Sequence, residues 1–119
     1  MFASTLLLAT GVMFGAFGAH ALRDRLPATD LDIYNKAVMY QLIHALGIGM
    51  IALLGMTQLD LQSACLRGGA ILLAGTIIFS GSLYLLVLTD TRWLGAITPI
   101  GGTLMIAGWL MLTWSIYRS

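Results

Sequence analysis

The chain has 119 residues, a mean hydropathy of +0.92 and 9% charged residues against 59% hydrophobic ones. Because soluble domains carry about 25% charged residues, this composition excludes an ordinary soluble domain. The formal net charge of +1 provides no basic surface for a nucleic acid, so we expect no nucleic-acid partner.

All charged side chains lie outside four long stretches, which are residues 1–22, 37–59, 68–89 and 93–117. A helix needs about 20 apolar residues to cross the hydrocarbon core of a bilayer, and each stretch is long enough. The sequence therefore predicts an all-α integral membrane protein, a four-helix bundle with four transmembrane helices and short connectors. We place the spans at approximately 2–22, 37–57, 68–88 and 98–117, within a single transmembrane domain of residues 1–119.

Glycines recur on one face of the first span and again in the fourth span. Membrane helices pack closely through small residues, so these positions predict helix contacts, foremost within the bundle and secondarily between copies. The predicted packing positions are Gly11, Gly15, Gly18, Gly101, Gly102 and Gly108. At 100° per residue, His20 points away from the glycines of its own helix.

The first connector, residues 23–36, carries six of the charges. Thr29 or Asp30 is expected to cap a second helix that begins near Asp30 and continues to about Met56. The connector aspartates are expected to pair with the basic residues of the same connector: Asp24, Asp30 and Asp32 with Arg23, Arg25 and Lys36. In the same way, Thr98 is expected to cap the fourth helix, since Pro99 suits a first helical position.

Polar side chains gather in one half of the predicted membrane. The first and third connectors lie on the same side of the membrane, where the first and third spans end and the second and fourth begin. The polar side chains that fall in the half of the membrane nearest to this side are His20, Tyr40, Gln41, His44, Ser80, Ser82, Tyr84 and Thr98. Polar groups at this depth need partners, so their helix faces are expected to point inward together.

The predicted cluster has several interpretations. Hydrogen bonds between helices would hold the bundle together, each contributing about 0.6 kcal/mol. A binding or conduction site around His44 would make the chain a subunit of a transporter or channel for a small polar solute or proton, with pH-dependent flux in liposomes. Paired ligation of haem by His20 and His44 is a weaker hypothesis, because the two residues differ in depth.

No catalytic constellation is evident in the sequence. The spans contain no carboxylate that could orient a histidine or act as a base, and no serine stands in a nucleophile-elbow motif. We therefore expect a non-enzymatic protein with no cofactor and no metal. Four short helices leave much glycine-rich surface without a packing partner inside one chain, so we expect a small homo-oligomer in the lipid bilayer.

The distribution of basic residues predicts an orientation. Arg23, Arg25, Lys36 and Arg92 lie in the first and third connectors, against Arg67 and Arg118 on the other side. By the positive-inside rule, the first and third connectors are cytoplasmic and both termini lie outside.

Motifs in all four spans resemble those of a known family of small inner-membrane proteins, typified by bacterial YgdD and YwdK. The family is domain of unknown function 423, with eukaryotic relatives in the transmembrane protein 256 group. The matching segments are GAFGAHAL at 15–22, YQ at 40–41 with HAL at 44–46, FSGSLY at 79–84, and TPIGG at 98–102 with GW at 108–109. The resemblance implies a four-helix protein of the bacterial inner membrane and no particular activity or ligand.

Overall fold

The computed structural model describes all of residues 1–119 and consists of helices joined by short turns. Two short 3-10 helices, Leu59–Leu61 and Arg92–Ala96, lie in the second and third connectors. The long helices are α1 (Phe2–Phe17, extended by a π-helical turn at Gly18–Leu22), α2 (Ala28–Thr57), α3 (Gln62–Thr89) and α4 (Thr98–Arg118). All four are long and apolar enough to cross a membrane, and no strand is present, so the predicted fold class is confirmed.

The starts of α2 and α4 differ from the prediction. Neither Thr29 nor Asp30 caps α2, because the helix begins at Ala28, two residues earlier than expected, and Pro27 occupies the N-cap position without a side-chain bond. Proline removes no helical hydrogen bond at this position, because the first amides of a helix have no acceptor within the helix. Thr98 is likewise the first residue of α4 and not its cap.

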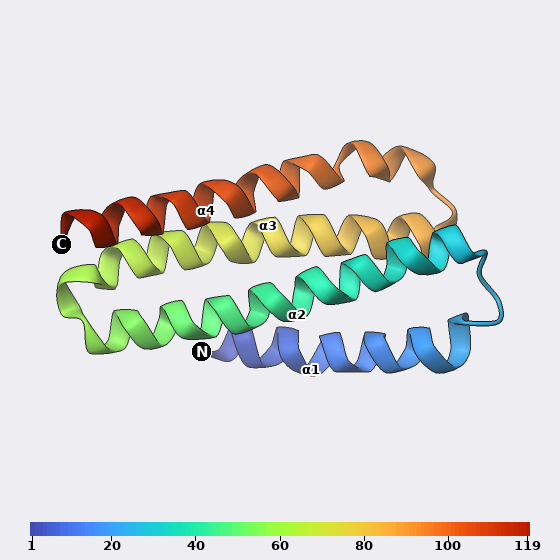
Figure 1. The fold of residues 1–119 in the computed structure, drawn as a ribbon, viewed down its shortest axis with the longest axis horizontal. Helices are drawn as coiled ribbons and strands as arrows, with labels where there is room; N and C mark the ends of the chain where they lie inside the picture. Colours follow the sequence, from blue (N-terminus) through green and yellow to red (C-terminus); the bar gives the residue numbers. More distant parts are fainter.

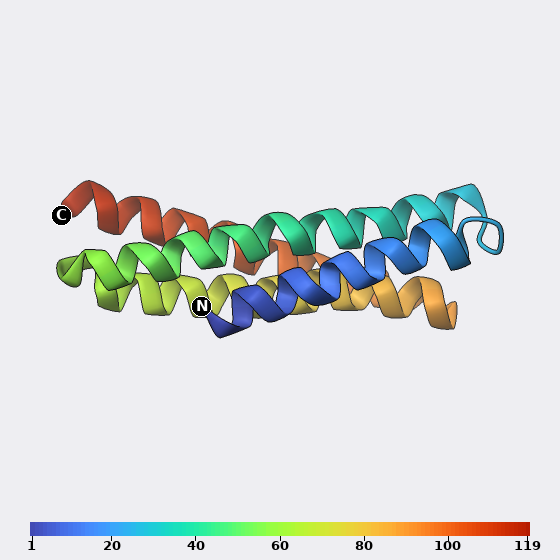
Figure 2. The same ribbon diagram turned by 90° about the horizontal axis from the view of Figure 1, so that it is seen from below.

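The helices lie in chain order across the molecule, from α1 at one edge to α4 at the other (Figure 1). Helix α2 packs against α1 and α3, and α3 packs against α2 and α4. Successive helices are antiparallel, with the connectors at the two ends of the long axis (Figure 2). The Cα atoms span 50 × 26 × 17 Å, so the bundle is flat, and both its broad faces would meet lipid.

The glycines of α1 face α2. A Cβ atom added at Gly11 would lie 2.6 Å from Leu42, and one at Gly18 would lie 2.6 Å from Tyr34. Gly15 faces Val38 at 3.3 Å. Because such short distances would force a neighbour to move, glycine at these positions lets α1 approach α2 closely.

Helices α3 and α4 approach even more closely, through glycines on both. A Cβ atom at Gly101 would lie 2.5 Å from the backbone nitrogen of Phe79 and 2.7 Å from the carbonyl oxygen of Gly75. One at Gly108 would lie 2.8 Å from Leu72. Gly102 is different, since its nearest neighbour is the Phe79 ring at 3.8 Å, an ordinary contact that alanine would also make.

Candidate functional site

Gln41 joins three helices through hydrogen bonds. This α2 side chain is 4% exposed, and its amide nitrogen donates to the Leu7 carbonyl and to Thr10 Oγ1 of α1, both at 2.9 Å. Its amide oxygen accepts a 2.8 Å bond from the hydroxyl of Tyr84 on α3. A side-chain amide has two N–H donors and two acceptor lone pairs on its oxygen. Both donors and one lone pair of this buried amide are therefore used inside the protein.

The hydroxyl groups of Ser80, Ser82 and Thr98 belong to other interfaces, and that of Tyr40 has no partner in the chain. Ser80 donates from α3 to the Ala37 carbonyl of α2 at 2.8 Å. The hydroxyls of Ser82 and Thr98 are 2.6 Å apart between α3 and α4. The predicted cluster is thus several separate hydrogen-bonded contacts, and no fully buried side-chain nitrogen or oxygen lacks a partner.

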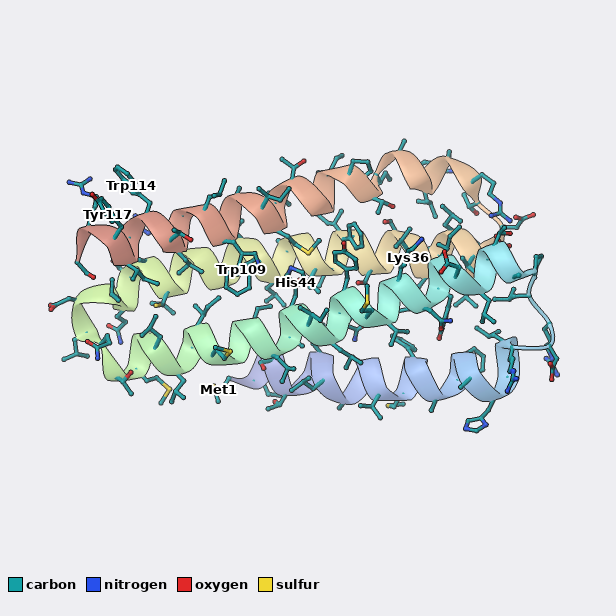
Figure 3. All side chains as sticks on the ribbon, in the orientation of Figure 1. Met1, Lys36, His44, Trp109, Trp114 and Tyr117 are labelled. Carbon is teal, nitrogen blue, oxygen red and sulfur yellow. The ribbon has the colours of Figure 1, made fainter.

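His44 faces α4 at the middle of the molecule, close to Trp109 (Figure 3). Its ring centroid lies 6.3 Å from that of Trp109 and 5.9 Å from that of Tyr40, on which it stacks. Its Nδ1 is 2.9 Å from the Tyr40 carbonyl oxygen one turn earlier. Tyr40 itself is 36% exposed, so it lies at the edge of the protein interior.

His20 does not join these residues, which corrects the prediction that placed it in the cluster. It is exposed on the π-helical turn after α1. The physical reason is the glycine face of α1: because that face packs on α2, the opposite side of the helix, which carries His20, points outward.

Haem ligation by His20 and His44 is therefore wrong. Gly18, two residues before His20, packs against Tyr34, which precedes His44 by ten residues of α2. Ten helical residues correspond to about 15 Å along the helix axis. Axial ligands must face each other across one iron atom, which this separation prevents. Nowhere do three or more His, Cys, Asp or Glu side chains gather to hold a metal ion.

Two hydrogen bonds between α1 and α2 were not predicted. The Tyr34 hydroxyl donates to the Phe14 carbonyl at 2.8 Å, and the Ser4 hydroxyl donates to the Ala45 carbonyl at 2.7 Å. A sequence signal for Ser4 existed, because it precedes Gly11 by seven residues and so lies on the helix face that packs against α2.

An ion pair between the largely buried Asp30 and the half-exposed Arg92 closes the end of the molecule that carries the first and third connectors. Arg92 donates two bonds to the carboxylate of Asp30, at 2.8 and 2.9 Å, and also contacts Asp90 at 2.6 Å. Asp30 was expected to pair within its own connector, and that is wrong; only the predicted Lys36–Asp32 pair forms there. Both Asp30 and Arg92 lie outside the uncharged stretches, and the bonds from Arg92 hold the pKa of Asp30 below its ordinary value.

Several grooves open on the flat bundle, and one of about 350 Å³ lies between α2 and α3 near the start of α1. A larger one, of about 590 Å³, lies between α2 and α4 and is lined by Gly47, Met50, Ile51, Leu53, Leu54, Thr57, Trp109, Leu112, Thr113 and Ile116. A smaller one, of about 190 Å³, lies between α1 and α3 beside Thr10, Gln41 and Tyr84. The accessible surface of both grooves is mainly apolar, but more residues with polar groups border the groove between α1 and α3.

The fold and the buried hydrogen bonds define a class: a helical membrane protein whose polar side chains connect its own helices. The model of the family described as "Protein of unknown function (DUF423)" matches residues 14–102. The chain belongs to this family.

Several bacterial relatives support this assignment. UPF0382 membrane protein SH2409 of Staphylococcus haemolyticus is 49% identical over 105 residues, covering 87% of this chain and 83% of the relative. UPF0382 membrane protein YwdK of Bacillus subtilis is 42% identical over 106 residues, covering 89% of this chain and 84% of the relative. A UPF0382 membrane protein of Staphylococcus epidermidis is 50% identical over 99 residues, covering 82% and 78%. No solved structure matches the chain.

Proposed function

We propose that this protein is a non-enzymatic structural or interaction protein of the bacterial inner membrane that forms a small homo-oligomer. The observation that carries the proposal is the bonding of Gln41, whose amide is engaged by α1 and α3. Polar groups committed to neighbouring helices stabilise a fold and have little capacity left to bind a solute or to catalyse a reaction.

The open arrangement of the helices supports the oligomer. Helices α1 and α4 lie at opposite edges and do not close the bundle, so each edge offers a helix for contact with a second copy. We expect purified protein to run as a defined oligomer in several mild detergents, with the subunit number read by native mass spectrometry. A monomer in every detergent at high protein concentration would refute this part of the proposal.

We further propose that the first and third connectors face the cytoplasm, because Arg23, Arg25, Lys36 and Arg92 lie there. A single cysteine introduced at Asp24, in a Cys65→Ser background, is expected to react with a membrane-impermeant maleimide only in inside-out vesicles. A cysteine introduced at Ser119 should react in right-side-out vesicles. The opposite pattern would reverse the orientation.

A transporter or channel subunit for a small polar solute or proton is a second candidate. The groove between α1 and α3 favours it, since polar groups of Thr10, Gln41 and Tyr84 lie beside it. It ranks second because those groups already bond to one another or to the backbone.

A further inference from the structure

His44 leaves one of its ring nitrogens without a partner in the chain. The Tyr40 carbonyl near Nδ1 can only accept a hydrogen bond, so Nδ1 carries the proton, and Nε2 of the neutral ring is an acceptor. Since every fully buried side-chain nitrogen and oxygen is hydrogen-bonded, the unbonded Nε2 touches accessible surface. The residue as a whole is only 9% exposed, so an otherwise buried side chain presents an acceptor to whatever covers this face.

Trp109 presents an unpaired donor on the same face. Its side chain is 39% exposed, and its indole N–H donates to no group of the chain. By contrast, the exposed hydroxyls of Thr103 and Thr113 on the same helix bond to the backbone carbonyl four residues earlier. The ring centroids of Trp109 and His44 are 6.3 Å apart, with no hydrogen bond between the rings (Figure 3). An acceptor and a donor therefore stand close together, and neither satisfies the other within one chain.

The depth of these two groups restricts their partners. His44 lies 16 positions after the start of α2 at Ala28 and 13 before its end at Thr57. These separations correspond to about 24 and 20 Å along the helix. Lipid headgroups and bulk water lie outside this depth, and hydrocarbon chains have no hydrogen-bonding groups. Lipid would therefore leave the acceptor and the donor unpaired, which favours a protein as their partner.

The Tyr40 hydroxyl is another donor near His44 without a partner in the chain. Helical side chains lean toward the N-terminus of their helix, so this hydroxyl, which starts one turn before His44, lies nearer the first connector. The same rule inclines the Trp109 ring, which contacts Gly47 three residues beyond His44, toward the depth of His44, because α4 begins at the same end as α2. Trp109 is therefore the donor that matches His44 in depth.

Two-fold symmetry supplies each of these groups with the other. Two copies inserted in the same orientation are related by an axis along the membrane normal, which leaves every residue at the same depth. Since the rings of Trp109 and His44 are 6.3 Å apart in one copy, the Trp109 ring of a second copy lies within that depth of His44. One rotation then creates two equal contacts, each between the donor of one copy and the acceptor of the other.

We propose that two copies of this chain dimerise through the face formed by α2 and α4, with the Trp109 N–H of each copy donating to His44 Nε2 of the other. This inference rests on the homo-oligomer of the proposed function and names its interface. The groove of about 590 Å³ that Trp109 lines accommodates apolar side chains of the second copy around the two bonds. A lipid chain is a poorer occupant of this face, because it leaves four polar groups of the two copies unpaired.

Energy transfer between fluorescently labelled copies in proteoliposomes tests the proposal. In a Cys65→Ser, Ser119→Cys background, donor-labelled and acceptor-labelled copies report the dimerisation constant as the ratio of lipid to protein is raised. We expect His44→Leu and Trp109→Phe each to weaken dimerisation about eightfold, since each removes both equivalent hydrogen bonds between membrane helices. Tyr40→Phe, which removes the other unpaired hydroxyl beside His44, should change the constant by less than about twofold.

Mixing the two weakened variants shows whether the bond crosses between copies. A dimer of one His44→Leu copy and one Trp109→Phe copy keeps one of the two bonds, whereas neither homodimer keeps any. Mixed dimers should therefore be about threefold more stable than either homodimer, beyond the statistical factor for mixing. Mixed dimers of the same stability as the homodimers would overturn the proposal.

Oxidative crosslinking is a second test that remains if His44→Leu does not fold. In a Cys65→Ser background, Met50→Cys places a thiol in the groove between α2 and α4, and Ile77→Cys places one in the groove between α1 and α3. Both native side chains are exposed, and we expect iodine to crosslink only the Met50→Cys protein into dimers.

The outcome separates this interface from the oligomer itself. Crosslinking of Ile77→Cys alone, or of neither variant in a protein that native mass spectrometry shows to be an oligomer, would overturn the α2–α4 interface while the oligomer stands. A protein that is monomeric by native mass spectrometry would refute both.

Discussion

Replacing Gly101 by alanine is expected to destabilise the folded protein by about 1–3 kcal/mol, the range found when a methyl group is forced into a packed interior. The added methyl would meet the backbone of α3 at Phe79 and Gly75, at 2.5 and 2.7 Å. Backbone atoms cannot move aside as a flexible side chain can, so α4 would have to shift away from α3.

Gly102→Ala is the matched control, since it adds the same methyl one residue further along α4. Its nearest neighbour would be 3.8 Å away, which is an ordinary contact. Helical circular dichroism during titration with sodium dodecyl sulfate in mixed micelles measures the difference in unfolding free energy. Equal midpoints for the two variants would mean that the α3–α4 approach is looser than the structure has it.

The tight contact of α3 and α4 was only half predictable from the sequence. Glycines in the fourth span were recognised as packing positions, but their partners on α3, Gly68 and Gly75, were not. They are seven residues apart, like Gly101 and Gly108, and this spacing aligns the glycines of two antiparallel helices along a shared seam. A search for small residues four apart does not find it.

The order in which the spans cross the membrane predicted that the polar side chains lie in one half of it. The same order did not predict their hydrogen-bond partners. Ser80 and Ser82 differ by two residues, so they point about 200° apart and serve different helix contacts. His20 was misplaced although its direction away from the glycines was recognised, because the sequence did not show which of the two faces packs on a neighbouring helix: the glycine face does, and His20 is left exposed.

The pairing of Arg92 with Asp30 also lay beyond the sequence. The residues are 62 positions apart, and nothing in either connector indicates which opposite charge it will meet. Only the packing of α2 against α3 brings the start of α2 beside the turn between α3 and α4. The pair of Asp32 and Lys36 is local, because the two residues are four apart on one helix and a single helical turn brings them together.

Gln41→Leu is expected to cost at least about 2 kcal/mol of stability, because it removes three hydrogen bonds at about 0.6 kcal/mol each between membrane helices. The change also leaves the Tyr84 hydroxyl buried without its acceptor, which adds a desolvation cost. Leucine is similar in size to glutamine, so packing changes contribute little. The same detergent titration measures the loss, and helix α1 should separate first, since two of the three bonds hold it.

Two tyrosines of this region provide a matched comparison. Tyr84→Phe removes a hydroxyl bonded to Gln41, whereas Tyr40→Phe removes a hydroxyl that has no partner in the chain. We expect a loss of about 0.6 kcal/mol for the first and none for the second. In the double variant with Gln41→Leu, the Tyr84→Phe loss should disappear, because a hydroxyl without an acceptor contributes no bond to lose. Additive losses would show that the amide and the phenol act independently. The hydrogen bond between them would then not be what links α2 to α3.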